Sequence, residues 1–169
     1  ELDALLISLD NTPNKSFLGS NAVLPVSLAF ARSSALLQGL PLYRYLSAGQ
    51  SVDMPRPQVL VIEGGRHGDW ATDIQEFMIL SAPGSFPSYS EILQASIRIF
   101  RELGKILETK NYSTGVGFEG AFCPREITSN EEAFELIIKA VEQSGFSLPD
   151  QFVLAVDVAA SEFYHDNRY

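Results

Sequence analysis

The order of hydrophobic patterns after Pro57 constrains the fold of this chain more than any other feature. Two short apolar runs, 58–65 and 73–81, flank a polar segment, and their length and bordering residues are typical of strands. Helical patterns then alternate with a short segment at 113–120 and a buried run at 151–160. The order strand, strand, helix, short strand, helix, strand predicts an α/β fold with parallel strands that opens with an antiparallel strand pair.

Serine and glutamate at a three-residue spacing mark the starts of both helices. Ser88 with Glu91, and Ser129 with Glu132, each form the pattern of a capping box ahead of apolar residues at helical spacing. Gly145 fits the C-terminal end of the second helix.

The residues before the linker favour helices. Asn21 can cap a helix over 22–38, which the Gly39–Pro41 segment ends, and a short turn can follow at 42–46. Pro25 lies near enough to the start to be tolerated, or else it moves the first full turn later.

The composition limits the classes of function. A net charge of -9 and a pI near 4.6 predict repulsion of nucleic acid and of anionic membranes, so neither is expected as a partner. An anionic substrate would need local positive charge or a bound metal. The single cysteine, Cys123, excludes an internal disulfide, and the sequence has neither a long apolar run nor a basic leader, so a cytoplasmic location is expected.

Polar side chains occur where the predicted strands begin or end. His67 follows the first strand, Glu76 begins the second, Glu119 follows the short strand and Asp157 closes the last. Because a hairpin partner runs antiparallel to the first strand, its start lies at the same end of the sheet, so all four residues are expected at one mouth. Taken singly, each residue would more often be structural or solvated than functional.

Five segments in order resemble the enolase family: "NKSFLGSNAVLPVSLAFA", "PLYRYL", "GGRHGDWATDIQEFMI", "GVGFEGAFCP" and "LAVDVAASEFY". The resemblance implies a barrel that opens with two antiparallel strands and is preceded by a smaller α+β domain. It also implies Mg²⁺-dependent loss of water from 2-phosphoglycerate to give phosphoenolpyruvate in glycolysis, and a homodimer in the full-length protein. Mg²⁺ in this superfamily stabilises the ene-diolate that forms when a proton leaves the carbon beside a carboxylate.

The matching positions imply roles for four residues. Glu119 is similar to the carboxyl group that helps the hydroxide depart, and Glu76 to its partner in handling that water. His67 is similar to the loop histidine that closes on the substrate phosphate, and Asp157 to the first carboxylate ligand of the tighter Mg²⁺.

The resemblance also implies domain boundaries. Residues 1–48 would be the helical end of the N-terminal domain, 49–57 a linker and 58–169 the first part of the barrel domain. The family's lysine base, its other metal ligands and a second histidine would lie downstream. We therefore expect this chain to be an incomplete segment of a longer enolase, or a truncated relative that needs a partner to close the sheet, and to be inactive alone.

Four matched positions differ from the family pattern. Phe118 stands where the family has Asp, Ala121 where it has Gly, Glu63 where it has Asn, and Arg66 where it has a small or polar residue. These differences leave open an alternative, a non-catalytic enolase-like binding or structural protein.

Overall fold

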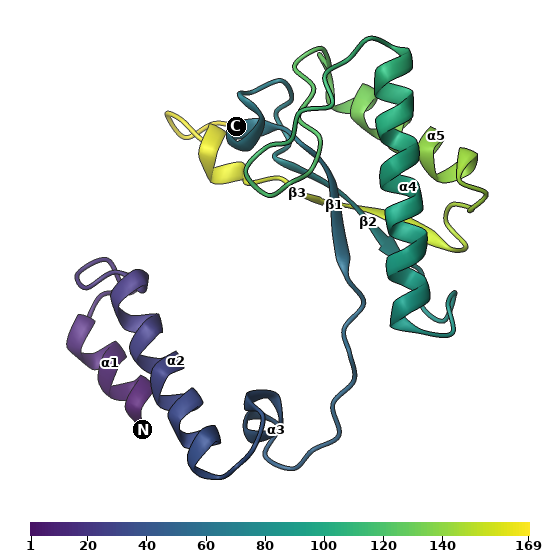
Figure 1. The fold of residues 1–169 in the computed structure, drawn as a ribbon. Coiled ribbons are helices and arrows are strands. Elements are labelled where there is room, and N and C mark those ends of the chain that lie inside the picture. Colours follow the sequence, from purple (N-terminus) through teal and green to yellow (C-terminus); the bar gives the residue numbers. More distant parts are fainter. The chain divides into compact units, whose positions relative to one another are not determined.

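A computed structural model describes residues 1–169 as two compact units, Glu1–Asp53 and Met54–Tyr169 (Figure 1). None of the helices combines the length and apolar character needed to cross a bilayer. The domain boundaries expected from the sequence stay a prediction.

The first unit is entirely helical. It contains α1 (Leu2–Asp10), α2 (Ser20–Leu37) and α3 (Leu42–Leu46). The sequence reasoning did not predict α1. The expected cap Asn21 is wrong, because α2 begins at Ser20, two residues earlier than expected, with Gly19 as its N-cap; the positive φ of 83° at this position suits glycine. Pro25 lies inside α2, close enough to its start that the helix continues.

The second unit combines a sheet with two long helices. Its elements are β1 (Gln58–Glu63), the 3₁₀ helix η1 (Gly65–Gly68), β2 (Glu76–Ser81), α4 (Tyr89–Thr109), α5 (Asn130–Gln143), β3 (Phe152–Asp157) and the 3₁₀ helix η2 (Ala160–Phe163). The serine half of each capping box is confirmed, since Ser88 Oγ accepts from Glu91 N–H and Ser129 Oγ accepts from Glu132 N–H. Gly145 follows α5 with a φ of 80°, as expected for a helix stop.

The three strands form one sheet in the order β1-β2-β3, and both neighbouring pairs are antiparallel. The predicted opening hairpin and the mixed helix-and-strand fold class are therefore confirmed. β1 and β3 run in the same direction, but they are not adjacent because β2 lies between them.

The predicted short strand at 113–120 is wrong. This segment is a loop in which Val116 makes a single isolated bridge, to Phe122, and Phe122 in turn bridges Ile62 of β1. The N–H groups of Glu119 and Ala121 donate to a side chain and so are not available to a strand ladder.

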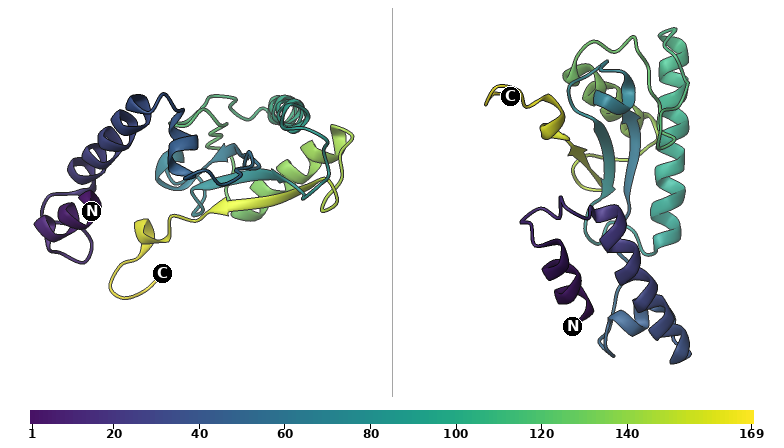
Figure 2. Two further views of the ribbon diagram at one scale, coloured as in Figure 1. Left: turned by 90° about the horizontal axis from the view of Figure 1, so that it is seen from below. Right: turned by 90° about the vertical axis from the view of Figure 1, so that its left-hand side faces the viewer.

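One apolar core joins the sheet to both long helices. Phe77 and Ile79 of β2 pack in it with residues of α4 and α5, among them Ile99, Leu103 and Ile137. Figures 1 and 2 show α4 running alongside the strands. Successive strand residues point to opposite faces, so Glu76, which precedes Phe77, lies on the face away from the helices.

We expect the cap of α5 to contribute measurably to the stability of the second unit. Replacing Ser129 with Ala removes the acceptor for Glu132 N–H and should lower the free energy of unfolding by about 1 kcal/mol. Urea denaturation followed by fluorescence of Trp70, the single tryptophan, measures this change. The control Ser90→Ala alters an exposed serine in the first turn of α4, so a loss as large as that of Ser129→Ala would contradict the prediction.

Candidate active site

The register of the sheet places three carboxylates side by side at one end. Glu63 of β1 pairs with Glu76 of β2, and Glu76 pairs with Asp157 of β3. Directly opposed residues of antiparallel strands point to the same face, so all three lie on the face away from α4 and α5. The expectation that Glu76 and Asp157 share one end of the sheet is confirmed.

A tight glycine-containing turn brings His67 back to this edge. Gly64 N–H donates to Gln75 O and Gly65 N–H donates to Thr72 O, which closes the loop between β1 and β2. A side chain at position 64 would collide with Thr72 Oγ1 and would approach Ile74 O within 2.6 Å. Glycine at this position therefore allows η1 to place His67 beside the start of β2.

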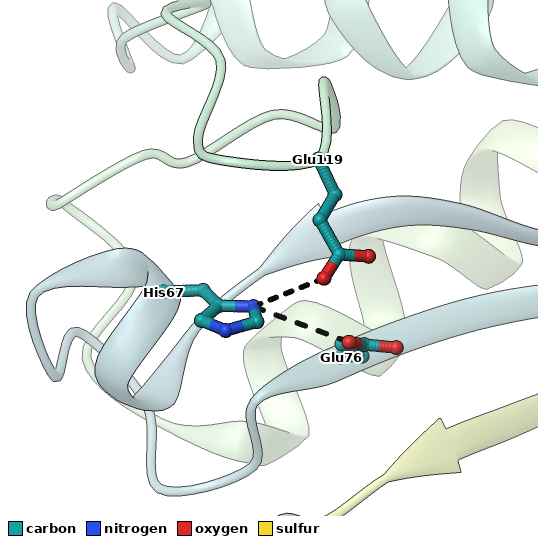
Figure 3. A group of neighbouring side chains, drawn as sticks. All are labelled: His67, Glu76 and Glu119. Atoms are coloured by element: carbon teal, nitrogen blue, oxygen red, sulfur yellow. Dashed lines mark ion pairs between the residues drawn. The ribbon is translucent and has the colours of Figure 1, made fainter. Parts of the chain in front are cut away.

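His67, Glu76 and Glu119 converge from three different segments (Figure 3). His67 Nδ1 lies 3.5 Å from Glu119 Oε1 and 4.0 Å from Glu76 Oε1. This nitrogen is buried and makes no hydrogen bond within the protein. Potential ligand atoms of the three residues all lie within 4.8 Å of one another, so the cluster can share a proton or contact one small ligand.

Burial distinguishes the two glutamates of this cluster. The Glu76 side chain is 14% exposed and that of Glu119 is 49% exposed. Burial raises the pKa of Glu76 above its ordinary value, the negative charges of Glu119 and Asp157 raise it further, and His67 partly opposes them. As pH falls, Glu76 gains a proton more readily than an ordinary glutamate does.

Asp157 lies at the carboxyl end of β3 and is exposed. Its Oδ1 accepts a hydrogen bond from Ala159 N–H at 2.9 Å. Mg²⁺ prefers oxygen ligands and is often held by one or two carboxylates together with substrate and water. The exposed Asp157 carboxylate is therefore a suitable type of ligand for Mg²⁺, as one of several.

A hollow of about 380 Å³ lies beside the histidine. Arg66, His67, Phe118, Cys123 and Arg125 are among its lining residues. The two arginines bring positive charge to this acidic protein, although Arg66 pairs with Glu162 and Arg125 pairs with Asp69. Burial raises the pKa of the Cys123 thiol, and the charge of Glu63 raises it further, which opposes a role as an activated nucleophile.

Glu63 is the site residue that sequence reasoning did not identify. Its side chain is 1% exposed, and its Oε1 accepts hydrogen bonds from Glu119 N–H and Ala121 N–H at 3.0 Å each. The sequence showed an extra acid before the glycine pair but gave no indication of these partners, which lie 56 and 58 residues away.

Comparison with protein families matches both parts of the chain. Residues 51–169 match the family model described as "Enolase, C-terminal TIM barrel domain", and residues 1–46 match "Enolase, N-terminal domain". Together with the antiparallel opening of the sheet, these matches define a partial enolase-type barrel preceded by part of the N-terminal domain. The chain belongs to the enolase family.

The raised pKa of Glu76 has a consequence for stability. A carboxyl whose pKa is higher in the folded state stabilises the fold below its unfolded-state pKa, and that contribution is lost as pH rises through the folded-state pKa. Glu76→Gln removes the charge, so we expect it to stabilise the native gene product at about pH 7, with the gain fading towards about pH 4.

Thermal or urea unfolding in metal-free buffer at both pH values measures this difference. Glu108→Gln, at an exposed position on α4, is the matched control and should show no such gain. An equal effect of Glu76→Gln at both pH values would contradict the assignment.

Proposed function

We propose that the native gene product is an enolase-type hydro-lyase that removes water from 2-phosphoglycerate to give phosphoenolpyruvate, with Mg²⁺ as cofactor, in glycolysis. The observation that supports this most is the convergence of His67, Glu76 and Glu119 at the end of the sheet where Asp157 also lies. The family membership supports the same reaction class.

The two glutamates would handle the leaving water. Departure of hydroxide requires a proton donor within reach of the leaving oxygen. Glu119 is the more exposed carboxyl and would face the substrate, while the raised pKa of the less exposed Glu76 favours retention of a proton in the pair. His67 Nδ1 lies within 4.0 Å of both carboxyls and has no hydrogen-bond partner in the protein, so it can contact either glutamate or a bound anion.

An anionic substrate would compete with Glu162 and Asp69 for Arg66 and Arg125 beside the cluster. His67 lines the hollow together with Arg66 and Arg125, and we assign the substrate phosphate to this side of the cluster. Asp157 would be one ligand of Mg²⁺, which when bound neutralises charge that develops on the substrate carboxylate. As in the family, we expect the full-length protein to form a homodimer and to bind neither nucleic acid nor membranes.

The catalytic assignment predicts a selective loss of turnover. Glu119→Gln should lower kcat for phosphoenolpyruvate formation by about 10²- to 10⁴-fold, the usual range for loss of a general acid or base. The assay follows the ultraviolet absorbance of phosphoenolpyruvate made by the native gene product. Glu108→Gln should retain full activity, and retention of activity by Glu119→Gln would refute the role.

The metal assignment predicts a changed dependence on Mg²⁺. Asp157→Asn replaces a charged oxygen ligand by a neutral one, so the Mg²⁺ concentration that gives half-maximal activity should rise by about tenfold or more. Asp166→Asn is the matched control, since Asp166 is exposed and, unlike Asp157, lies outside the sheet that carries Glu76. If both variants need the same Mg²⁺ concentration as the unaltered protein, Asp157 is not a ligand.

One observation favours the alternative, a non-catalytic enolase-like protein. Phe118 is 83% exposed, and its ring lies edge-on to His67 with centroids 5.8 Å apart. Phe118 presents an apolar surface at a position where the enolase family has an aspartate. If the folded native gene product forms no phosphoenolpyruvate with Mg²⁺ present, the binding or structural role replaces the proposed reaction.

A further inference from the structure

Glu63 holds the loop that carries Glu119. Its carboxylate is almost completely buried, and a single oxygen, Oε1, accepts both Glu119 N–H and Ala121 N–H at 3.0 Å. The two bonds fix the backbone on both sides of Gly120 to the end of β1.

The loop also encloses the second oxygen of the same carboxylate. Glu63 Oε2 is buried and has no hydrogen-bond partner in the protein. A Cβ at Gly117 would collide with this oxygen and would lie 2.7 Å from Glu63 Cδ. The three atoms nearest to that Cβ all belong to Glu63, so the glycine is matched to this one side chain.

The turn is closed on itself as well as on Glu63. Gly117 N–H donates to Ala121 O at 3.0 Å, which closes the turn over residues 117–121. The side chain of Glu119 is 49% exposed and makes no hydrogen bond of its own. The place of its carboxylate, 3.5 Å from His67 Nδ1, is therefore set mainly by its backbone.

We propose that Glu63 is a positioning residue, whose buried carboxylate fixes the 117–121 loop so that Glu119 faces His67 and Glu76. The expected effect of Glu63 on turnover rests on the proposed function. The expected effect of Glu63 on the loop does not, because its hydrogen bonds to the loop are present without substrate.

The first test measures amide hydrogen exchange of the native gene product without substrate. Glu63→Ala should speed exchange at the N–H groups of Glu119 and Ala121 by about tenfold or more. The N–H groups of Phe77 and Ile79, in the sheet, are internal controls and should keep their rates. Unchanged exchange at Glu119 and Ala121 would overturn the proposal.

A second variant keeps this test decisive if Glu63→Ala does not fold. Glu63→Gln retains one oxygen that can accept both N–H groups, so exchange at Glu119 and Ala121 should stay within about threefold of the unaltered protein. Faster exchange at both amides in Glu63→Ala together with protection in Glu63→Gln supports the proposal. If Glu63→Ala is unfolded, Gly117→Ala replaces it in this test. Faster exchange at Glu119 and Ala121 in Gly117→Ala, with the sheet amides unchanged, then supports the proposal, and unchanged exchange at these two amides overturns it.

The third experiment is a double-mutant cycle between Glu63 and Gly117. The φ of Gly117 lies outside the left-handed region, so alanine is compatible with the backbone and its obstacle is the Glu63 side chain. Gly117→Ala alone should lower kcat by about tenfold or more with little change in KM, because a displaced Glu119 weakens interactions made in the transition state. In the Glu63→Ala background the same change should cost less than about twofold.

The cycle and the exchange measurement fail in different ways. Multiplicative losses in the double variant would show that the two residues act independently and would overturn the positioning role. If the native gene product lacks turnover but its loop amides lose protection in Glu63→Ala, the proposed function fails while the structural part of the inference stands. If the native gene product is active but loop exchange is unchanged in Glu63→Ala, the proposed function stands and the positioning role of Glu63 fails.

Discussion

The pairing of β2 with both of its neighbours is the constraint on which the site depends. The reversal of the chain at Gly64 and Gly65 sets the register in which Glu63, Glu76 and Asp157 lie side by side. A shift of one residue in an antiparallel pair would turn Glu76 towards the core and Phe77 away from it. Burial of Phe77 among α4 and α5 therefore holds the carboxylates on the opposite face.

Features that depend on neighbouring residues were predictable from the sequence. The capping serines Ser88 and Ser129 were recognised from the three-residue spacing alone, and the structure places both hydrogen bonds there. The apolar pattern was less specific within a helix, since Leu93 and Ile97 of α4 are apolar residues that are nevertheless 42% and 44% exposed. In α4, Ala95 and Ile99 occupy the buried face instead.

Features that depend on distant residues were predictable only in part. The shared location of Glu76 and Asp157 followed from hairpin geometry, which needs only the direction of each strand. The state of Glu63 did not follow, because its burial depends on N–H groups that the 117–121 loop supplies. The same hydrogen bonds explain the wrong strand prediction for this loop, since the N–H groups of Glu119 and Ala121 donate to Glu63 and not to a neighbouring strand.

The cluster of acids also has an energetic meaning for the fold. Burial and the negative charges of Glu119 and Asp157 raise the pKa of Glu76, so the ionised form of this carboxyl is disfavoured. Such repulsion lowers stability without any benefit to packing, which is the pattern expected where a protein retains groups for function. A cation or a protonated His67 would relieve it, and both would act on the face of the sheet that the helices leave uncovered. The site and the core therefore occupy opposite faces of the same three strands, and changes to the charges can alter chemistry while the packing that sets the register stays intact.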